Sequence, residues 1–104
     1  MQSEIHDQVE VLAGAAFTAD DIARACGVQV TWVQERVQAG VLRVDHATGD
    51  WRFDGATLVR ARRIARLETT FDADPQLAAL AADLIEEVEM LRRRLRAVEA
   101  GGRA

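Results

Sequence analysis

The sequence predicts a mainly α-helical protein that combines a helix-turn-helix, a small β-hairpin and a long C-terminal helix. Apolar residues recur at steps of four and three over residues 77–98, which is the spacing of a narrow apolar seam along one helix. Two short helical patterns meet at a tight turn within residues 26–32, as in helix-turn-helix motifs. Apolar and polar residues alternate over 41–44 and 51–53, around a polar turn at 46–50, which is typical of a hairpin.

We expect these elements to form one domain with an extended arm. With 104 residues, the chain is long enough to fold around a single core. The expected organisation is an N-terminal lead-in at 1–16, a winged helix-turn-helix domain at 17–72, a long C-terminal helix at 73–100 and a tail at 101–104.

The first two helices have clear start and stop signals. Thr18 is a good N-cap, and Asp21 three residues later completes a capping box. Gly27 is expected to end this helix. The second helix is predicted over residues 30–39, with Gly40 after its end.

Asp54 is predicted to cap a third helix at about 55–70, and residues 69–74 to form an elbow into the long helix. Asp74 and Pro75 give the long helix a defined start, and Gly101 and Gly102 are expected to end it. At 100° per residue, one face of the third helix is apolar and comprises Leu58, Ala61, Ile64, Ala65 and Phe71.

Charge is strongly segregated along the chain. The net charge is −4, and segments 1–42, 43–66, 67–91 and 92–104 carry −4, +3, −7 and +4. All thirteen basic residues are Arg. This distribution does not fit a uniformly basic nucleic-acid-binding protein.

No catalytic set is recognisable in the sequence. A single Cys26 and two His, His6 and His46, provide neither an internal disulfide nor a zinc ligand set. Cys26 is expected to be a small core residue. We therefore expect a non-enzymatic, cytoplasmic protein without cofactor, metal ion, small-molecule ligand or membrane span.

Two surfaces of the long helix are candidates for partner binding. The seam extends beyond what a small body can cover, which favours a homodimer, parallel or antiparallel, through Leu84, Val88, Leu91, Leu95 and Val98. The acidic segment is either a solvated face or a docking face for a basic partner.

The second helix is poor in cations for a DNA reader. Recognition of the major groove commonly uses several Arg, Lys, Asn or Gln side chains, with further basic residues on phosphates. Residues 29–38 hold one Arg and one Glu. The alternative function is nevertheless that of a DNA-binding regulator without an effector domain. It would use Arg36, Arg43, Arg52, Arg62, Arg63 and Arg66.

Three stretches, in order, carry a family resemblance: FTADDIARACGVQVTWVQERVQAGVL, WRFDGATLVRARRIARL and LAALAADLIEEVEMLRRRLRAVEA. Together they resemble the MerR-like winged-helix class and, more narrowly, the chaperone-modulator family CbpM. The chain departs from the family pattern at Gln29, where such turns often have Ser, and at TTFDADPQ, which is more polar than the usual elbow.

The resemblance implies a non-enzymatic chaperone modulator. Proteins of the CbpM family bind the J-domain of a DnaJ-like (CbpA-type) co-chaperone and inhibit its action with the Hsp70 DnaK. J-domains present a basic helix to an acidic Hsp70 surface, so we hypothesise that an acidic surface of this chain takes the place of Hsp70. The residues proposed for this surface are Asp83, Glu86 and Glu87, together with Glu68 and Asp72.

Overall fold

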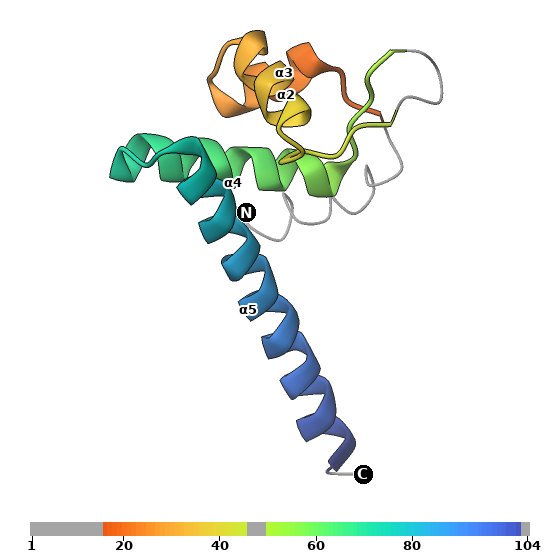
Figure 1. Cartoon of the computed structure of the whole chain (residues 1–104). Helices are drawn as coiled ribbons and strands as arrows, with labels where there is room; N and C mark the ends of the chain where they lie inside the picture. Colours follow the sequence, from red (N-terminus) through yellow and green to blue (C-terminus); the bar gives the residue numbers. More distant parts are fainter. Residues whose placement is uncertain (1–15, 46–49, 103–104) are drawn as a thin grey trace.

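The computed structural model describes residues 16–45 and 50–102, and it is mainly helical, as predicted. These residues form helices α2 (Ala19–Cys26), α3 (Val30–Gln38), α4 (Gly55–Phe71) and α5 (Pro75–Gly102). In Figure 1, α2 and α3 lie together on one side of α4, and α5 leaves the far end of α4 as a long arm. Of the lead-in predicted at residues 1–16, residues 1–15 lie outside the described residues.

Local capping chemistry places α2, as predicted. The Thr18 side chain accepts a hydrogen bond from the backbone N–H of Asp21 (3.1 Å), and the Asp21 carboxylate accepts one from the N–H of Thr18 (2.9 Å). These hydrogen bonds hold the pKa of Asp21 below its usual value, the N–H of Thr18 contributing most. Gly27 follows in the left-handed conformation with φ 69°, which glycine adopts without strain.

Helices α3 and α4 begin where predicted, whereas the ends of α3, α4 and α5 differ from the predicted ones by one or a few residues. Asp54 caps α4 by accepting from the N–H of Thr57 (2.8 Å), and Asp74 accepts from the N–H groups that open α5. Helix α4 continues through Phe71, so the elbow is residues 72–74 rather than 69–74. Phe71 is 71% exposed and does not join the buried face of α4, and α5 continues through Gly102.

The predicted wing is not shown as a two-stranded hairpin. Between α3 and α4, the described residues form isolated antiparallel bridges, Asp45 with Arg52 and Phe53 with Phe17, and no strand. The turn at residues 46–49 lies outside the described residues. The bridge from Phe53 to Phe17 ties the segment before α4 to the segment before α2 through two backbone hydrogen bonds of 2.8 and 2.9 Å.

The hydrophobic core is built around α4, which packs against α2 and against the first turns of α5, while α3 packs against α2. Its largest fully buried side chains are Phe53, Ile22, Ile64 and Val33. Helix α5 contributes small residues, Ala78, Ala79 and Ala82, which let its backbone approach α4 closely. Cys26 is half-buried and packs against this core.

A polar cluster fixes α3 onto α4. The Glu68 carboxylate accepts two hydrogen bonds from Arg36 Nη2, one from Arg36 Nε and one from Trp32 Nε1, at 2.8–3.1 Å. The Arg36 guanidinium also lies 4.6 Å from the centre of the Trp32 ring, in cation–π contact. Arg36 is only 8% exposed. Because the ion pair is largely shielded from water, its loss should be costly.

We predict that Glu68→Gln lowers the free energy of unfolding by about 3 kcal/mol, since it leaves the buried Arg36 guanidinium with only the exposed Glu35 carboxylate, 3.6 Å away, as a counter-charge. Urea denaturation followed by circular dichroism measures this change. Glu87→Gln, at an exposed position of α5, is the matched control and should stay within about 0.5 kcal/mol. Equal losses in both variants would contradict a structural role for the cluster.

Candidate interaction surfaces

Among residues 16–45 and 50–102, no group of three or more His, Cys, Asp and Glu side chains could hold a metal ion. No helix in the same residues is long and apolar enough to cross a membrane. His6 and His46 lie outside the described residues. The residues predicted for partner binding lie on α4, α5 and the elbow between them.

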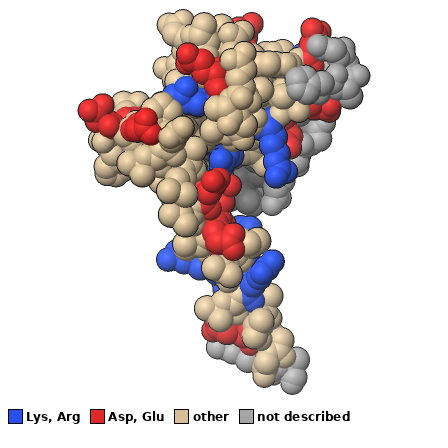
Figure 2. Space-filling view, viewed as in Figure 1, with Lys and Arg blue, Asp and Glu red and all other residues tan. Residues whose placement is uncertain are grey.

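The acidic side chains of α5 face arginines of α4. Arg60 Nη2 lies 2.9 Å from an Asp83 oxygen, and Arg60 Nη1 lies 2.8 Å from a Glu86 oxygen. One turn further along each helix, Arg63 Nη2 lies 3.0 Å from a Glu89 oxygen. Figure 2 shows this alternation of basic and acidic side chains where α5 meets the body. The acidic segment is therefore partly neutralised within the chain.

Arg60 is the centre of this ladder of ion pairs. Besides its two carboxylates, it donates from Nε to the backbone carbonyl of Val41, just after α3 (2.9 Å). Burial lowers the pKa of Arg60, but the hydrogen bonds and charges of Glu86 and Asp83 outweigh it and raise the pKa above the usual value. The guanidinium thus stays charged and joins three parts of the chain: helix α4, helix α5 and the residues that follow α3.

The residues proposed for partner docking fall into three groups. Glu68 is held by Arg36 and Trp32, with its side chain only 16% exposed, so it is engaged within the fold. Asp83 and Glu86 share Arg60 and remain partly open to solvent. Glu87 and Asp72 are exposed and have no ion pair with a described residue.

The negative charge of residues 67–91 is partly offset by arginines that pair with them in the fold. Residues 67–91 contain seven carboxylates. Three arginines, Arg36, Arg60 and Arg63, pair with four of them. Seven negative charges less three positive charges leave −4. That charge extends from the elbow, where acidic atoms gather in Figure 2, along the first half of α5.

The arginines considered for DNA binding do not form one surface. Arg36 and Arg63 are engaged in ion pairs, whereas Arg43, Arg62 and Arg66 are exposed. Arg52 is half-buried, exchanges backbone hydrogen bonds with Asp45 and donates from its side chain to the carbonyl of Trp51. The exposed residues of α3 are Thr31, Gln34, Glu35 and Gln38, none of which is a cation.

The outer face of α5 is apolar and uncovered within the chain. Its large side chains are between 45% and 70% exposed: Leu77, Leu80, Leu84, Val88, Leu91, Leu95 and Val98. They are spaced by three and four residues, so they share one face. Ala78, Ala79 and Ala82 lie on the opposite face, against α4. The uncovered apolar face therefore extends along α5 from Leu77 to Val98.

Sequence reasoning missed the α4–α5 ladder, although a signal was present. Arg60 and Arg63 are three residues apart, and Asp83, Glu86 and Glu89 repeat the same step. Equal spacing of opposite charges on two neighbouring helices is the pattern that such a ladder requires. The hydrogen bond from Trp32 to Glu68 joins residues far apart in the chain, so spacing could not reveal it.

Comparison with known proteins identifies one family. Residues 17–100 match the family model described as MerR HTH family regulatory protein. No curated protein and no solved structure matches the chain.

We predict that Arg60→Gln lowers the free energy of unfolding by about 1–2 kcal/mol, because it removes charge-assisted hydrogen bonds to two partly exposed carboxylates. Arg62→Gln is the matched control on the same helix, where the side chain is exposed and has no ion pair with a described residue. It should change stability by less than about 0.5 kcal/mol. Equal effects in thermal or urea denaturation would show that the ladder contributes nothing to stability.

Proposed function

Because the chain belongs to the family of MerR HTH regulatory proteins, we propose that it is a non-enzymatic regulator that acts by binding a basic protein. The proposed partner is the J-domain of a DnaJ-like (CbpA-type) co-chaperone, and binding inhibits the action of this co-chaperone with the Hsp70 DnaK. The regulatory family is the premise, and the identity of the partner rests on the resemblance to the CbpM family.

The observation that carries the proposal is the orientation of Arg36. This arginine is the only basic residue of α3, and it is directed into the fold, onto Glu68. The exposed face of α3 then consists of Thr, Gln and Glu side chains. Protein–DNA affinity depends heavily on cations that neutralise phosphates. A helix without an exposed cation is a poor reader of DNA but suits contact with a protein.

The negative charge that remains on α5 and the elbow supports a basic partner. Asp83 and Glu87 are exposed on α5, and Asp72 is exposed at the elbow. Complementary charge steers association and selects against partners of the wrong sign. Glu68 does not belong to this proposed surface because the fold already uses its carboxylate.

The proposed mechanism is competition. An acidic surface that occupies the basic helix of a J-domain prevents the same helix from reaching the acidic surface of Hsp70. No covalent step, metal ion or cofactor is required. The partly paired carboxylates Asp83 and Glu86 can exchange Arg60 for a basic residue of the partner, because their side chains are 60% and 40% exposed.

Self-association through α5 is the second part of the proposal. The outer face of this helix exposes large apolar side chains over its whole length, and such patches mark interfaces. Their heptad-like spacing fits a second copy of the same helix. The flanking charges allow either orientation, since Glu87 can meet Arg92 of a parallel partner and acidic and basic halves can meet in an antiparallel pair.

We predict that Asp83→Lys/Glu87→Lys weakens binding of a purified J-domain at least about tenfold at low salt, because two attractive charges become repulsive. Isothermal titration calorimetry measures the affinity. The matched control is Asp20→Lys/Glu99→Lys, which makes the same change of charge at exposed positions of α2 and of the end of α5. It should leave the affinity within about threefold.

Two outcomes would overturn the proposal. One is unchanged J-domain affinity in the α5 variant, or no binding by the unaltered protein. The other is salt-sensitive binding of duplex DNA by the isolated protein in a gel-shift titration, which would favour a DNA-binding regulator that uses Arg43, Arg52, Arg62 and Arg66.

We predict that Leu91→Glu/Leu95→Glu raises the dissociation constant of the dimer more than about a hundredfold, since each buried leucine contributes about 2 kcal/mol. Sedimentation velocity measures the oligomeric state. Arg93→Glu, on the opposite side of the helix, should leave the dimer intact. A monomeric unaltered protein would contradict self-association.

In a Cys26→Ser/Val98→Cys variant, a rapidly formed disulfide dimer would indicate parallel helices.

A further inference from the structure

The four arginines of α4 divide into two pairs with different surroundings. Arg60 and Arg63 face α5 and are paired with its carboxylates. Arg62 and Arg66 are exposed and have no ion pair within residues 16–45 and 50–102. They are four residues apart and so neighbours on the helix surface, where like charges repel each other. The fold itself supplies no counter-charge for this second pair.

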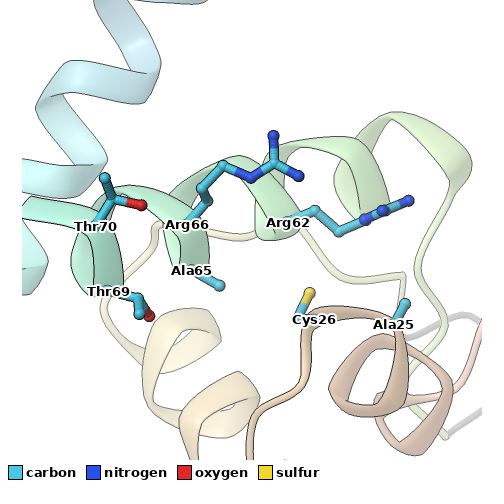
Figure 3. A pocket seen from close by; sticks show the side chains of 7 residues that line it. All are labelled: Ala25, Cys26, Arg62, Ala65, Arg66, Thr69 and Thr70. Carbon is cyan, nitrogen blue, oxygen red and sulfur yellow. The ribbon is translucent and has the colours of Figure 1, made fainter.

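The second pair of arginines lies at an open cleft between α2 and α4, with a volume of about 290 Å³. Arg62, Arg66, Thr69 and Thr70 line it from α4, and Ala25 and Cys26 line it from α2. Figure 3 shows both guanidinium groups extending the same way along α4, while the Cys26 thiol points towards α4. The lining thus combines two cations, two hydroxyl groups and a thiol, and contains no carboxylate.

We propose that this cleft binds a small oxyanion of the phosphate class. Guanidinium groups bind phosphate through two parallel N–H···O hydrogen bonds, and a threonine hydroxyl can donate a further one. Ala25 and Ala65 complete the lining of the cleft with small side chains. The bound oxyanion would supply the counter-charge that Arg62 and Arg66 lack within the fold.

The surroundings favour a small ligand over a nucleic acid. Two cations can neutralise only a few phosphates, whereas duplex binding requires many such contacts. The neighbouring exposed face of α3 adds Glu35 and no cation. The cleft is open, and its volume is at the lower end of the usual size of ligand pockets, which favours a small ligand over an extended backbone.

Cys26 provides a direct readout of occupancy. It is the only cysteine of the chain and it lines the cleft. Burial raises the pKa of its thiol, and the positive charge of Arg62 opposes that rise. An oxyanion bound to Arg62 would therefore slow alkylation in two ways, by covering the sulfur and by cancelling the charge that favours the reactive thiolate.

The test measures the rate of Cys26 alkylation by iodoacetamide, a neutral reagent, in the full chain at mildly alkaline pH. Inorganic phosphate is compared with chloride at equal ionic strength. We expect saturable protection, about tenfold at ten times the dissociation constant, because only the unoccupied fraction reacts. Each rate is normalised to that of the same variant in chloride.

Two variants separate binding at the cleft from general effects. Arg62→Gln/Arg66→Gln should abolish protection, with circular dichroism verifying the fold. Arg92→Gln/Arg96→Gln removes the same charge from the exposed arm and should leave protection unchanged. Equal alkylation rates in phosphate and in chloride would overturn the proposal, as would protection by phosphate that survives in the first variant. Stronger protection by duplex DNA than by phosphate, at equal phosphate concentration, would overturn the assignment to a small ligand.

Discussion

The ion pair between Glu68 and Arg36 determines how the helix-turn-helix faces its surroundings. One carboxylate accepts hydrogen bonds from Arg36 and Trp32, and all three side chains are largely withdrawn from solvent. In such a low-dielectric environment an unpaired member would be costly, so the arrangement of α3 on α4 is strongly specified. The same contact removes the single basic side chain of α3 from its outer face. One interaction thus decides both the packing of the body and the chemistry of its surface.

The arginines of α3 and α4 are divided between those paired with carboxylates of another helix and those without such a pair. Arg36, Arg60 and Arg63 lie where carboxylates of another helix can meet them, and they join α3, α4 and α5. Arg62 and Arg66 point to the other side of α4 and meet no carboxylate among the described residues. A chain with a net charge of −4 therefore has a basic cleft on one side and an acidic, apolar arm on the other. Two surfaces of opposite character can bind different ligands without competing.

Local chemistry predicted the helices well, because their ends are set by neighbouring residues. Thr18 with Asp21, Asp54, and Asp74 before Pro75 all act as expected. Features that depend on how helices pack were missed. Phe71 shares a face with Ile64 by angle, but α4 extends past the body at that point, so its ring is exposed. The acids of α5 appeared free because the sequence does not give the crossing of α4 and α5. The hairpin pattern at 41–53 corresponds to isolated bridges among the described residues.

A small rotation at the short joint between α4 and α5 moves the tip of α5 through a large distance. Three residues connect the helices, Asp72 is in the left-handed conformation with φ 48°, and Pro75 fixes its own φ. The joint thus has few free torsions, and the Arg60 and Arg63 contacts hold the angle. Helix α5 has 28 residues, a length of about 42 Å at 1.5 Å per residue. A rotation of about 10° at the joint would carry its tip through about 7 Å, more than one helical turn. Small adjustments of the three ion pairs between α4 and α5 therefore displace the tip, and anything bound to it, by a large distance.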